Sequence, residues 1–354
     1  MEFCLNFFPD AWPDRKPGDQ YFREVLDLVE IGEELGYDSV KIVEHYFTPY
    51  GGYSPNPIVF LAAASQRTRN MRFITGCVLP VFNHPLKLAG EIGMIDCITG
   101  GRFELGIARA FLPHEFDAFG VPMDESRARF EEGVDILIRL LTEENVTHDG
   151  KFHRWSRPVT SLPRPVQKPH PPIWIATVAT RESFEWVGRR GYRLMVVPYL
   201  APYEELAENI KLYRETYRAF GHPPENERVL MVLHMYAAES PREAREGARP
   251  HMMQYIQTFL HAVRDWGSRS STSYSRAYSK IPELLEAMTY DRVLGEHRAL
   301  IGTPDEIVEQ MRYLESVFGR IDVPSMQVNF GMMPFEKARR SIELFAKYAM
   351  PKLR

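Results

Sequence analysis

Several features that would place the chain in other protein classes are missing from its sequence. Only 3 of 354 residues are cysteine, and Cys4, Cys77 and Cys97 are widely spaced without a CxxC pair. This pattern argues against a disulfide framework or a thiolate metal site, and we expect small core residues instead. No apolar run reaches the roughly 18 residues of a membrane-spanning helix. The formal net charge of −4 argues against nucleic acid or an anionic membrane as the main partner.

Nucleotide-binding and metal-binding motifs are missing too. Gly100, Gly101 and Gly106 lack Gly-x-Gly-x-x-Gly spacing, and no GxxxxGK[ST] loop occurs, which argues against a nicotinamide Rossmann domain and a P-loop. The first strand-like stretch, Phe3–Phe8, has no His-x-His pair of the kind a metal-dependent barrel hydrolase uses, so no metal is expected. The N-terminal residues lack the basic region and cleavage site of a signal peptide, and a cytoplasmic protein is expected.

Strand-like and helix-like stretches alternate along the chain. Eight short apolar stretches read as strands: Phe3–Phe8, Ser39–Val43, Arg72–Leu79, Arg102–Ile107, Ile173–Ala176, Leu194–Val197, Val229–Tyr236 and Ser325–Asn329. Repeated strand–helix units with short links favour parallel strands and right-handed crossovers. The sequence therefore predicts an α/β fold, a (β/α)8 TIM barrel with insertions, as a single domain over residues 1–354.

Two segments interrupt this repeat. Val146–Trp155 reads as an inserted hairpin that turns at Asp149-Gly150. Trp266–Ser279 is polar and has no period; it lies before the predicted eighth strand, inside an insertion of about residues 262–297. A loop at this place is either a lid over the active face of the barrel or a passive surface insertion.

Charged and polar side chains follow several predicted strands. Arg109 comes just after a strand and Arg127 lies in the first turn of the next helix. Because strand carboxyl ends carry the active site in such barrels, two arginines there suit an anionic, phosphorylated ligand. Alternatively, each arginine pairs with a carboxylate. His45 ends the second strand, where an imidazole serves as general acid or base, or is structural.

Small residues mark two further positions. Thr75-Gly76-Cys77 places them in a predicted strand, which indicates close approach of a flat ring, or else a bulge or tight helix packing. Thr177–Ser183 leads from a strand into a helix and offers backbone N–H groups to a phosphate. Alternatively, Thr180 is simply the helix N-cap.

An ordered series of motifs resembles the bacterial luciferase-like family of flavin-dependent monooxygenases, over nearly the whole chain. The motifs are Glu44–Gly51, Leu79-Pro80 with His84-Pro85-Leu86, Gly100–Arg109, Phe119–Arg127, Ile301–Pro304 and Ala349–Leu353. The resemblance implies a (β/α)8 barrel. It also implies an FMN-dependent monooxygenase that uses reduced FMN and O2, through a C4a-(hydro)peroxyflavin, to oxygenate a small organic substrate. The reduced FMN would come from a separate flavin reductase.

The resemblance also assigns roles to residues. Arg109 and Arg127 would hold the FMN phosphate, helped by the backbone near Val178 and Arg181. Thr75 and Gly76 would lie against the flavin ring, where the family often has a non-prolyl cis peptide, and His45 would be the catalytic histidine. Trp266–Ser279 would be a mobile lid. Members are commonly homodimers, whose interface would use the helices around Ile58–Arg67 and Lys87–Ile98.

Three departures from the family pattern leave alternatives open. Ala108 replaces a reactive cysteine, Tyr46 the second histidine of a His-His pair, and Val178 a phosphate-binding serine. Light emission with a long-chain aldehyde is therefore not expected. A deazaflavin-dependent hydride transfer and a non-catalytic flavin-binding protein remain as alternatives. Aromatic residues near the expected mouth suit an apolar or aromatic substrate: Tyr46, Phe47, Tyr50, Phe111, Phe116 and Tyr199.

Overall fold

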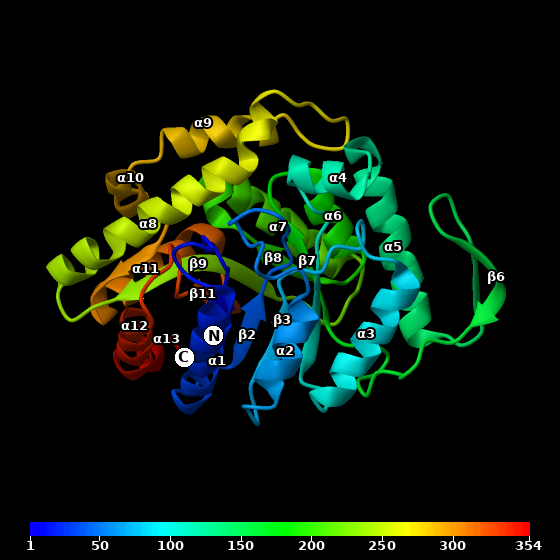
Figure 1. Ribbon diagram of the computed structural model, residues 1–354, viewed down its shortest axis with the longest axis horizontal. Helices are drawn as coiled ribbons and strands as arrows, with labels where there is room; N and C mark the ends of the chain where they lie inside the picture. Colours follow the sequence, from blue (N-terminus) through cyan, green and yellow to red (C-terminus); the bar gives the residue numbers. More distant parts are fainter.

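The computed structural model describes residues 1–199 and 201–354, and a closed parallel barrel lies at its centre (Figure 1). Its eight strands are β1 (Cys4–Phe7), β2 (Ser39–Ile42), β3 (Arg72–Thr75), β4 (Phe103–Ile107), β7 (Ile173–Thr177), β8 (Arg193–Val196), β9 (Val229–Ala237) and β11 (Val323–Gln327). They pair in this order, and pairing of β11 with β1 closes the ring. The predicted (β/α)8 barrel is confirmed.

Helices surround the barrel and follow its strands. They are α1 (Gly18–Glu34), α2 (Pro57–Ser65), α3 (Pro85–Ile98), α4 (Pro113–Phe119), α5 (Ser126–Thr142), α6 (Arg181–Arg189), α7 (Tyr203–Ala219), α8 (Pro241–Val263), α9 (Ile281–Glu286), α10 (Tyr290–Gly295), α11 (Pro304–Phe318), α12 (Phe335–Tyr348) and α13 (Met350–Leu353). Local chemistry sets their ends. Thr303 and Glu306 form a capping box at the start of α11, and Gly36, with a φ of 86°, follows α1.

The core has two parts. Apolar faces of the helices pack on the outside of the barrel and form the larger cluster. Inside the barrel, a smaller apolar cluster includes Trp174, Met195 and Leu230, all buried. Among the described residues, no helix combines the length and the apolar composition that crossing a membrane would need.

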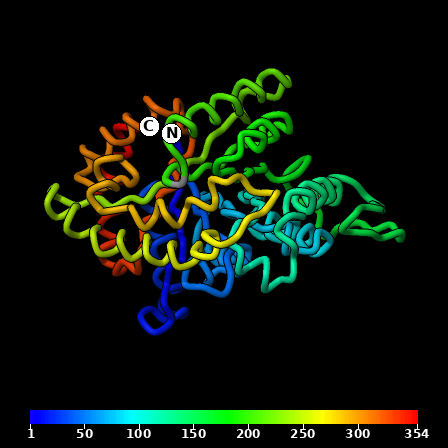
Figure 2. Tube along the Cα trace, turned by 90° about the horizontal axis from the view of Figure 1, so that it is seen from above, coloured from blue at the N-terminus to red at the C-terminus, as the bar shows by residue number. Residues whose placement is uncertain are grey.

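Insertions stand at the side and at the carboxyl end of the strands. The expected hairpin is confirmed as β5 (Val146–Asp149) and β6 (Arg154–Val159), which project from the body (Figure 1). Residues 264–297 follow α8 and run across the carboxyl end of the barrel, as the yellow to gold tube seen from above shows (Figure 2).

The structure corrects several details of the prediction. β3 is shorter than Arg72–Leu79 because it ends at Thr75, before a cis peptide bond between Gly76 and Cys77. A strand that the sequence did not predict, β10 (Leu300–Gly302), pairs with the end of β9 outside the ring. All three cysteines were expected in the core. Cys4 and Cys77 are buried there, but Cys97 is exposed on α3.

Candidate active site

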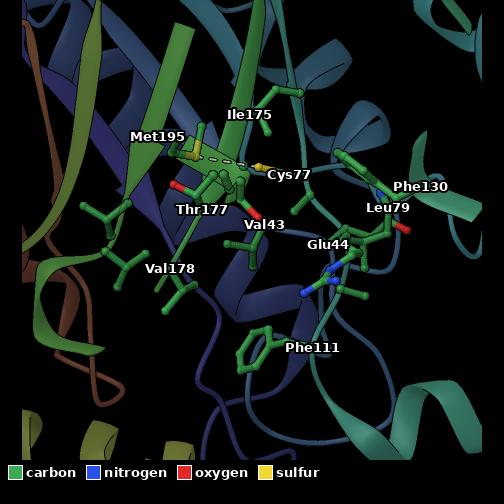
Figure 3. Close-up of a pocket in the computed structure, with 18 of the residues that line it drawn as sticks. Val43, Glu44, Cys77, Leu79, Phe111, Phe130, Ile175, Thr177, Val178 and Met195 are labelled. Carbon is green, nitrogen blue, oxygen red and sulfur yellow. Dashed lines mark hydrogen bonds between the residues drawn. The ribbon is translucent and has the colours of Figure 1, made fainter. Parts of the chain in front are cut away.

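A pocket opens where the barrel strands end. It receives residues that follow β2, β4, β7 and β8, together with the first turns of α5 and α6. Seven aromatic side chains are part of its walls: Phe8, Tyr50, Phe111, Phe130, Trp186, Tyr199 and Tyr278. Of the six aromatic residues expected at the mouth, Tyr50, Phe111 and Tyr199 line this pocket, whereas Tyr46, Phe47 and Phe116 do not. Figure 3 shows Phe111 across the pocket from Ile175 and Met195.

His45 lies just beyond β2, in the wall of the pocket. Its Nδ1 is 3.0 Å from Oε1 of Glu115, which is fully buried on α4 and also accepts a hydrogen bond from the Tyr46 backbone N–H at 2.9 Å. With Glu115 ionised, the imidazole donates through Nδ1 and keeps Nε2 for another partner. Gly51 makes room for this ring, because a Cβ there would lie 2.7 Å from Cβ of His45.

Glu44 precedes the histidine and is a second buried carboxyl group at the pocket. It accepts hydrogen bonds from the Leu79 backbone N–H at 3.1 Å and from Nδ2 of Asn83 at 2.8 Å, and the Tyr46 hydroxyl donates to it as well. Burial raises the pKa of Glu44 to about 8 in spite of these donors. This carboxyl group therefore holds a proton at neutral pH.

Arg109 and Arg127 both line the pocket, as expected of an anion site. Arg109 stacks on Tyr274, with its guanidinium carbon 4.1 Å from the ring centroid, and donates to the Ser273 carbonyl. Arg127 has an acidic neighbour only at 3.9 Å, on Glu131 of the same helix. The expected alternative, pairing with a carboxylate, is thus present in a loose form at Arg127, through Glu131 of the pocket lining, and is absent at Arg109 among the described residues.

Polar groups at the start of α6 face the same pocket. Val178, Thr180 and Ser183 line it, whereas the Arg181 side chain is exposed and is not part of the lining. Thr180 occupies the N-cap position, but its side chain makes no capping hydrogen bond. The Thr177 hydroxyl is buried and also lacks a hydrogen-bond partner.

The end of β3 forms the inner wall. Gly76 and Cys77 line the pocket, and the Cys77 and Met195 sulfur atoms lie 3.7 Å apart (Figure 3). Thr75 is buried outside the lining, where its hydroxyl exchanges two 2.8 Å hydrogen bonds with the backbone of Gly106. The non-prolyl cis peptide lies at Gly76-Cys77 rather than at Thr75-Gly76.

Residues after α8 cover the loop that follows β4. Trp266 Nε1 donates to the Phe111 carbonyl and the Tyr274 hydroxyl to the Ala110 carbonyl, both at 2.8 Å. Asp124 accepts from the Ser271 hydroxyl at 2.6 Å and the Thr272 N–H at 2.7 Å. These hydrogen bonds anchor the polar segment Trp266–Ser279 to the loop after β4. Short helical turns lie at its two ends, at Arg264–Gly267 and Tyr278–Lys280.

Comparison with known families decides what this barrel is. The luciferase-like monooxygenase family matches residues 1–320 of the chain. The chain belongs to this family.

Several known proteins resemble the chain over nearly its whole length. The oxygenase component of a flavin-dependent trigonelline monooxygenase from Acinetobacter baylyi is 27% identical, over 99% of this chain and 95% of that protein. The crystal structure of the monooxygenase RslO1 from Streptomyces bottropensis is 43% identical, with both chains fully covered and a TM-score of 0.88. A type II Baeyer–Villiger monooxygenase from Pseudomonas putida, solved with FMN, shares the fold at 22% identity, 99% coverage of both chains and a TM-score of 0.83.

Local patterns in the sequence of this member of the luciferase-like family do not reveal several residues of the site. Glu115 was not singled out because it lies 70 residues from His45 and gives no local signal. Lys41 and Asn6 were read as parts of ordinary strands, yet both line the pocket. A polar residue inside an otherwise apolar strand was the available signal for these two.

Proposed function

We propose that the protein is an FMN-dependent monooxygenase that uses externally reduced FMN and O2 to oxygenate a small organic substrate. One observation carries this proposal: a single pocket with aromatic walls is lined by the cations Arg109 and Arg127 and by His45, whose Nδ1 contacts the buried Glu115. Reduced FMN would supply the O2 chemistry, which no amino-acid side chain provides. The relatives that match the chain include flavin-dependent monooxygenases.

The pocket residues fit a flavin phosphate and ring. Arg109 supplies charge with no carboxylate partner among the described residues, Arg127 has only Glu131 at 3.9 Å, and the unpartnered Thr177 hydroxyl supplies a further hydrogen bond. The backbone near Val178 and Arg181 opens α6 beside them. Gly76 and Cys77 line the pocket at the end of β3, where the Lys41 side chain fills the space that a Cβ on Gly76 would take, and Thr75 is buried behind them.

In this proposal the chain itself binds, orients and protects the reactants. The aromatic walls and the residues after α8 exclude water, which strengthens electrostatic interactions in the pocket. His45, held through Nδ1 by Glu115, presents Nε2 for proton transfer. Residues 266–279 act as a lid whose opening admits reduced FMN and the substrate.

A homodimer and a flavin reductase are the protein partners in this proposal. Large apolar side chains are exposed on two neighbouring helices: Val59 on α2, and Met94 and Ile98 on α3. Leu162 and Val166, in the segment beside α3, extend this apolar surface. The reductase follows from the oxygenase-component description of the trigonelline relative.

The deciding experiment is an anaerobic titration with photoreduced FMN, followed by an oxygen pulse recorded by absorption. We expect binding and a transient species distinct from oxidised flavin. Arg109→Ala and Arg127→Ala should each weaken reduced-FMN binding about tenfold or more, as expected for a lost charge-assisted contact. Arg189→Ala, at the exposed far end of α6, is the matched control.

Other outcomes identify the alternatives. Binding of a deazaflavin in place of FMN would move the protein to hydride transfer. Binding of FMN without an oxygen-derived transient, and without oxygen consumption in a substrate screen with a generic reductase and NADH, would leave a flavin-binding protein. Unchanged FMN affinity in both arginine variants would refute the phosphate site.

A further inference from the structure

A layer of four polar side chains crosses the inside of the barrel below the pocket. Register places Lys41 of β2 beside Asn6 of β1, Asn6 beside Gln327 of β11, and Gln327 beside His234 of β9. Paired residues of neighbouring parallel strands point to the same side, so the four share one face of the sheet. All four are at most 2% exposed. Asn6 and Lys41 also line the pocket, so the layer forms part of its floor.

Hydrogen bonds within the described residues leave this layer unsatisfied. Both side-chain polar atoms of Asn6, both of Gln327 and both ring nitrogens of His234 lack a hydrogen-bond partner. Burial lowers the pKa of His234 to about 3, so its ring is neutral. Buried polar groups without partners are rare in native proteins because each costs free energy. A set of them in one layer calls for an explanation.

Lys41 is the most costly member. Its side chain folds over Gly76, where a Cβ would lie 2.6 Å from Nζ. The charged or titratable neighbours that act on it are the thiols of Cys77 and Cys4, and no carboxylate of the described chain pairs with it. Burial lowers the pKa of Lys41 accordingly.

The other end of the barrel shows how this chain handles buried charge when no ligand is involved. There Glu104 accepts from Arg193 at 3.1 Å and from Nε1 of Trp174 at 2.6 Å, and Arg72 lies 3.3 Å away. Those charges neutralise one another. Lys41 has no such partner, and it faces the pocket.

We propose that Lys41, with Asn6 beside it, binds an acidic oxygen of the substrate, a carboxylate, phenolate or enolate, at the floor of the pocket. An anionic oxygen supplies the missing counter-charge and accepts hydrogen bonds from both side chains. Ordered water would satisfy Asn6, Gln327 and His234, but it carries no charge to balance Lys41. The aromatic walls above select the remainder of the molecule, a flat apolar body. This assignment of substrate class rests on the proposed oxygenase function.

The test uses a matched pair of probes, 4-fluorobenzoate and its neutral isostere 4-fluorobenzamide. Each is titrated by ¹⁹F NMR under anaerobic conditions, with and without photoreduced FMN, into the full-length wild type and Lys41→Met. We expect the wild type to prefer the benzoate, and Lys41→Met to weaken benzoate binding about tenfold to a hundredfold, the loss expected for one charge-assisted contact. Binding of the benzamide and of reduced FMN should stay within about threefold.

Variants control for folding and for general charge effects. Lys151→Met removes an exposed lysine from the distant hairpin connection and should leave benzoate binding unchanged. Thermal unfolding of Lys41→Met should occur at or above the wild-type temperature, because removing an unpaired buried charge does not destabilise the fold. A lower unfolding temperature would show that Lys41 has a structural role and would overturn the proposal. Asn6→Leu should weaken benzoate binding less than Lys41→Met does.

The outcomes separate this proposal from the flavin assignment. Equal benzoate binding by wild type and Lys41→Met overturns the substrate site. If Lys41→Met instead loses only the binding of reduced FMN, the proposal is also overturned, since Lys41 would then bind the flavin. If reduced FMN does not bind but the benzoate still depends on Lys41, the anion site stands and the oxygenase function fails.

Discussion

At the scale of single residues, the pocket combines groups with opposite electrostatic tasks. Glu44 and Glu115 are both buried near His45, but their partners differ. Glu115 accepts from the imidazole and one backbone N–H, whereas Glu44 accepts from neutral donors alone. Burial without a cation keeps Glu44 protonated, since its pKa is about 8.

His45→Ala should lower turnover of an oxygenated substrate by about 10² to 10⁴, the usual contribution of a general acid or base. Reduced-FMN affinity should stay within about twofold, because Arg109 and Arg127 are unchanged. Glu115→Gln should lower turnover less, since the imidazole remains and an amide oxygen at this position still accepts from Nδ1. The measurements are steady-state turnover with a coupled reductase and the anaerobic titration. Wild-type turnover in His45→Ala would remove this residue from catalysis.

The raised pKa of Glu44 should make the free energy of unfolding depend on pH. Its pKa is about 8 in the folded protein against an ordinary value of 4.5, so the folded state keeps a proton that the unfolded chain releases. This contribution to stability is therefore complete below about pH 4.5 and is lost as pH rises toward 8, at up to about 1.4 kcal/mol per pH unit. Glu44→Gln should flatten this slope in urea unfolding at several pH values, whereas Glu34→Gln, on an exposed part of α1, should not. A slope equal to that of the wild type would disprove the raised pKa.

At the scale of elements, the segment after α8, residues 264–297, has the structure that is hardest to predict from local sequence. Low hydrophobicity and the lack of a period indicate an irregular segment, and they do not reveal which surface it contacts. Trp266 and Tyr274 anchor it to the loop after β4, and Asp124 receives two further hydrogen bonds from it. These anchors lie more than 140 residues away along the chain.

Asp124→Ala should loosen this segment, because it removes the acceptor of the Ser271 and Thr272 hydrogen bonds. We expect tryptic cleavage after Arg276 to become about tenfold faster, because the loosened segment opens more often. Reduced FMN should slow the cleavage of the wild type if the segment is a lid. Asp149→Ala, in the hairpin, is the control. Cleavage that is insensitive to both FMN and Asp124→Ala would identify a passive insertion.

At the scale of the whole molecule, the barrel leaves an apolar surface on α2 and α3. Val59 is 68% exposed and Met94 47%, which is unusual for large apolar side chains on neighbouring helices of a monomer. These are the helices at which the family resemblance places a dimer interface. A second copy of the chain would bury this surface.

Met94→Glu should convert the proposed homodimer to a monomer, because it places a charge in the centre of an apolar contact. Size-exclusion chromatography with light scattering measures the mass directly. Phe220→Glu, at an exposed apolar residue at the end of α7, should leave the dimer intact. A wild type that is monomeric at micromolar concentration would disprove the interface.

Local sequence is enough to predict the order of strands and helices, since hydrophobic period, capping residues and glycine stops are local properties. It also placed His45, Arg109 and Arg127 at strand or helix ends, and the structure brings all three to one pocket. It missed β10 and α4, which are short and lack a distinctive period.

Contacts between side chains that are distant in the sequence depend on how the barrel closes. Glu115 reaches His45, and Lys41 and Asn6 join Gln327 and His234 in one layer, because the barrel closes with a particular register. A one-residue shift of that register would turn each of these side chains to the other face of its strand. Local sequence predicts which residues of a strand point into the barrel. Which of these residues lie next to one another depends on how the strands pair when the barrel closes.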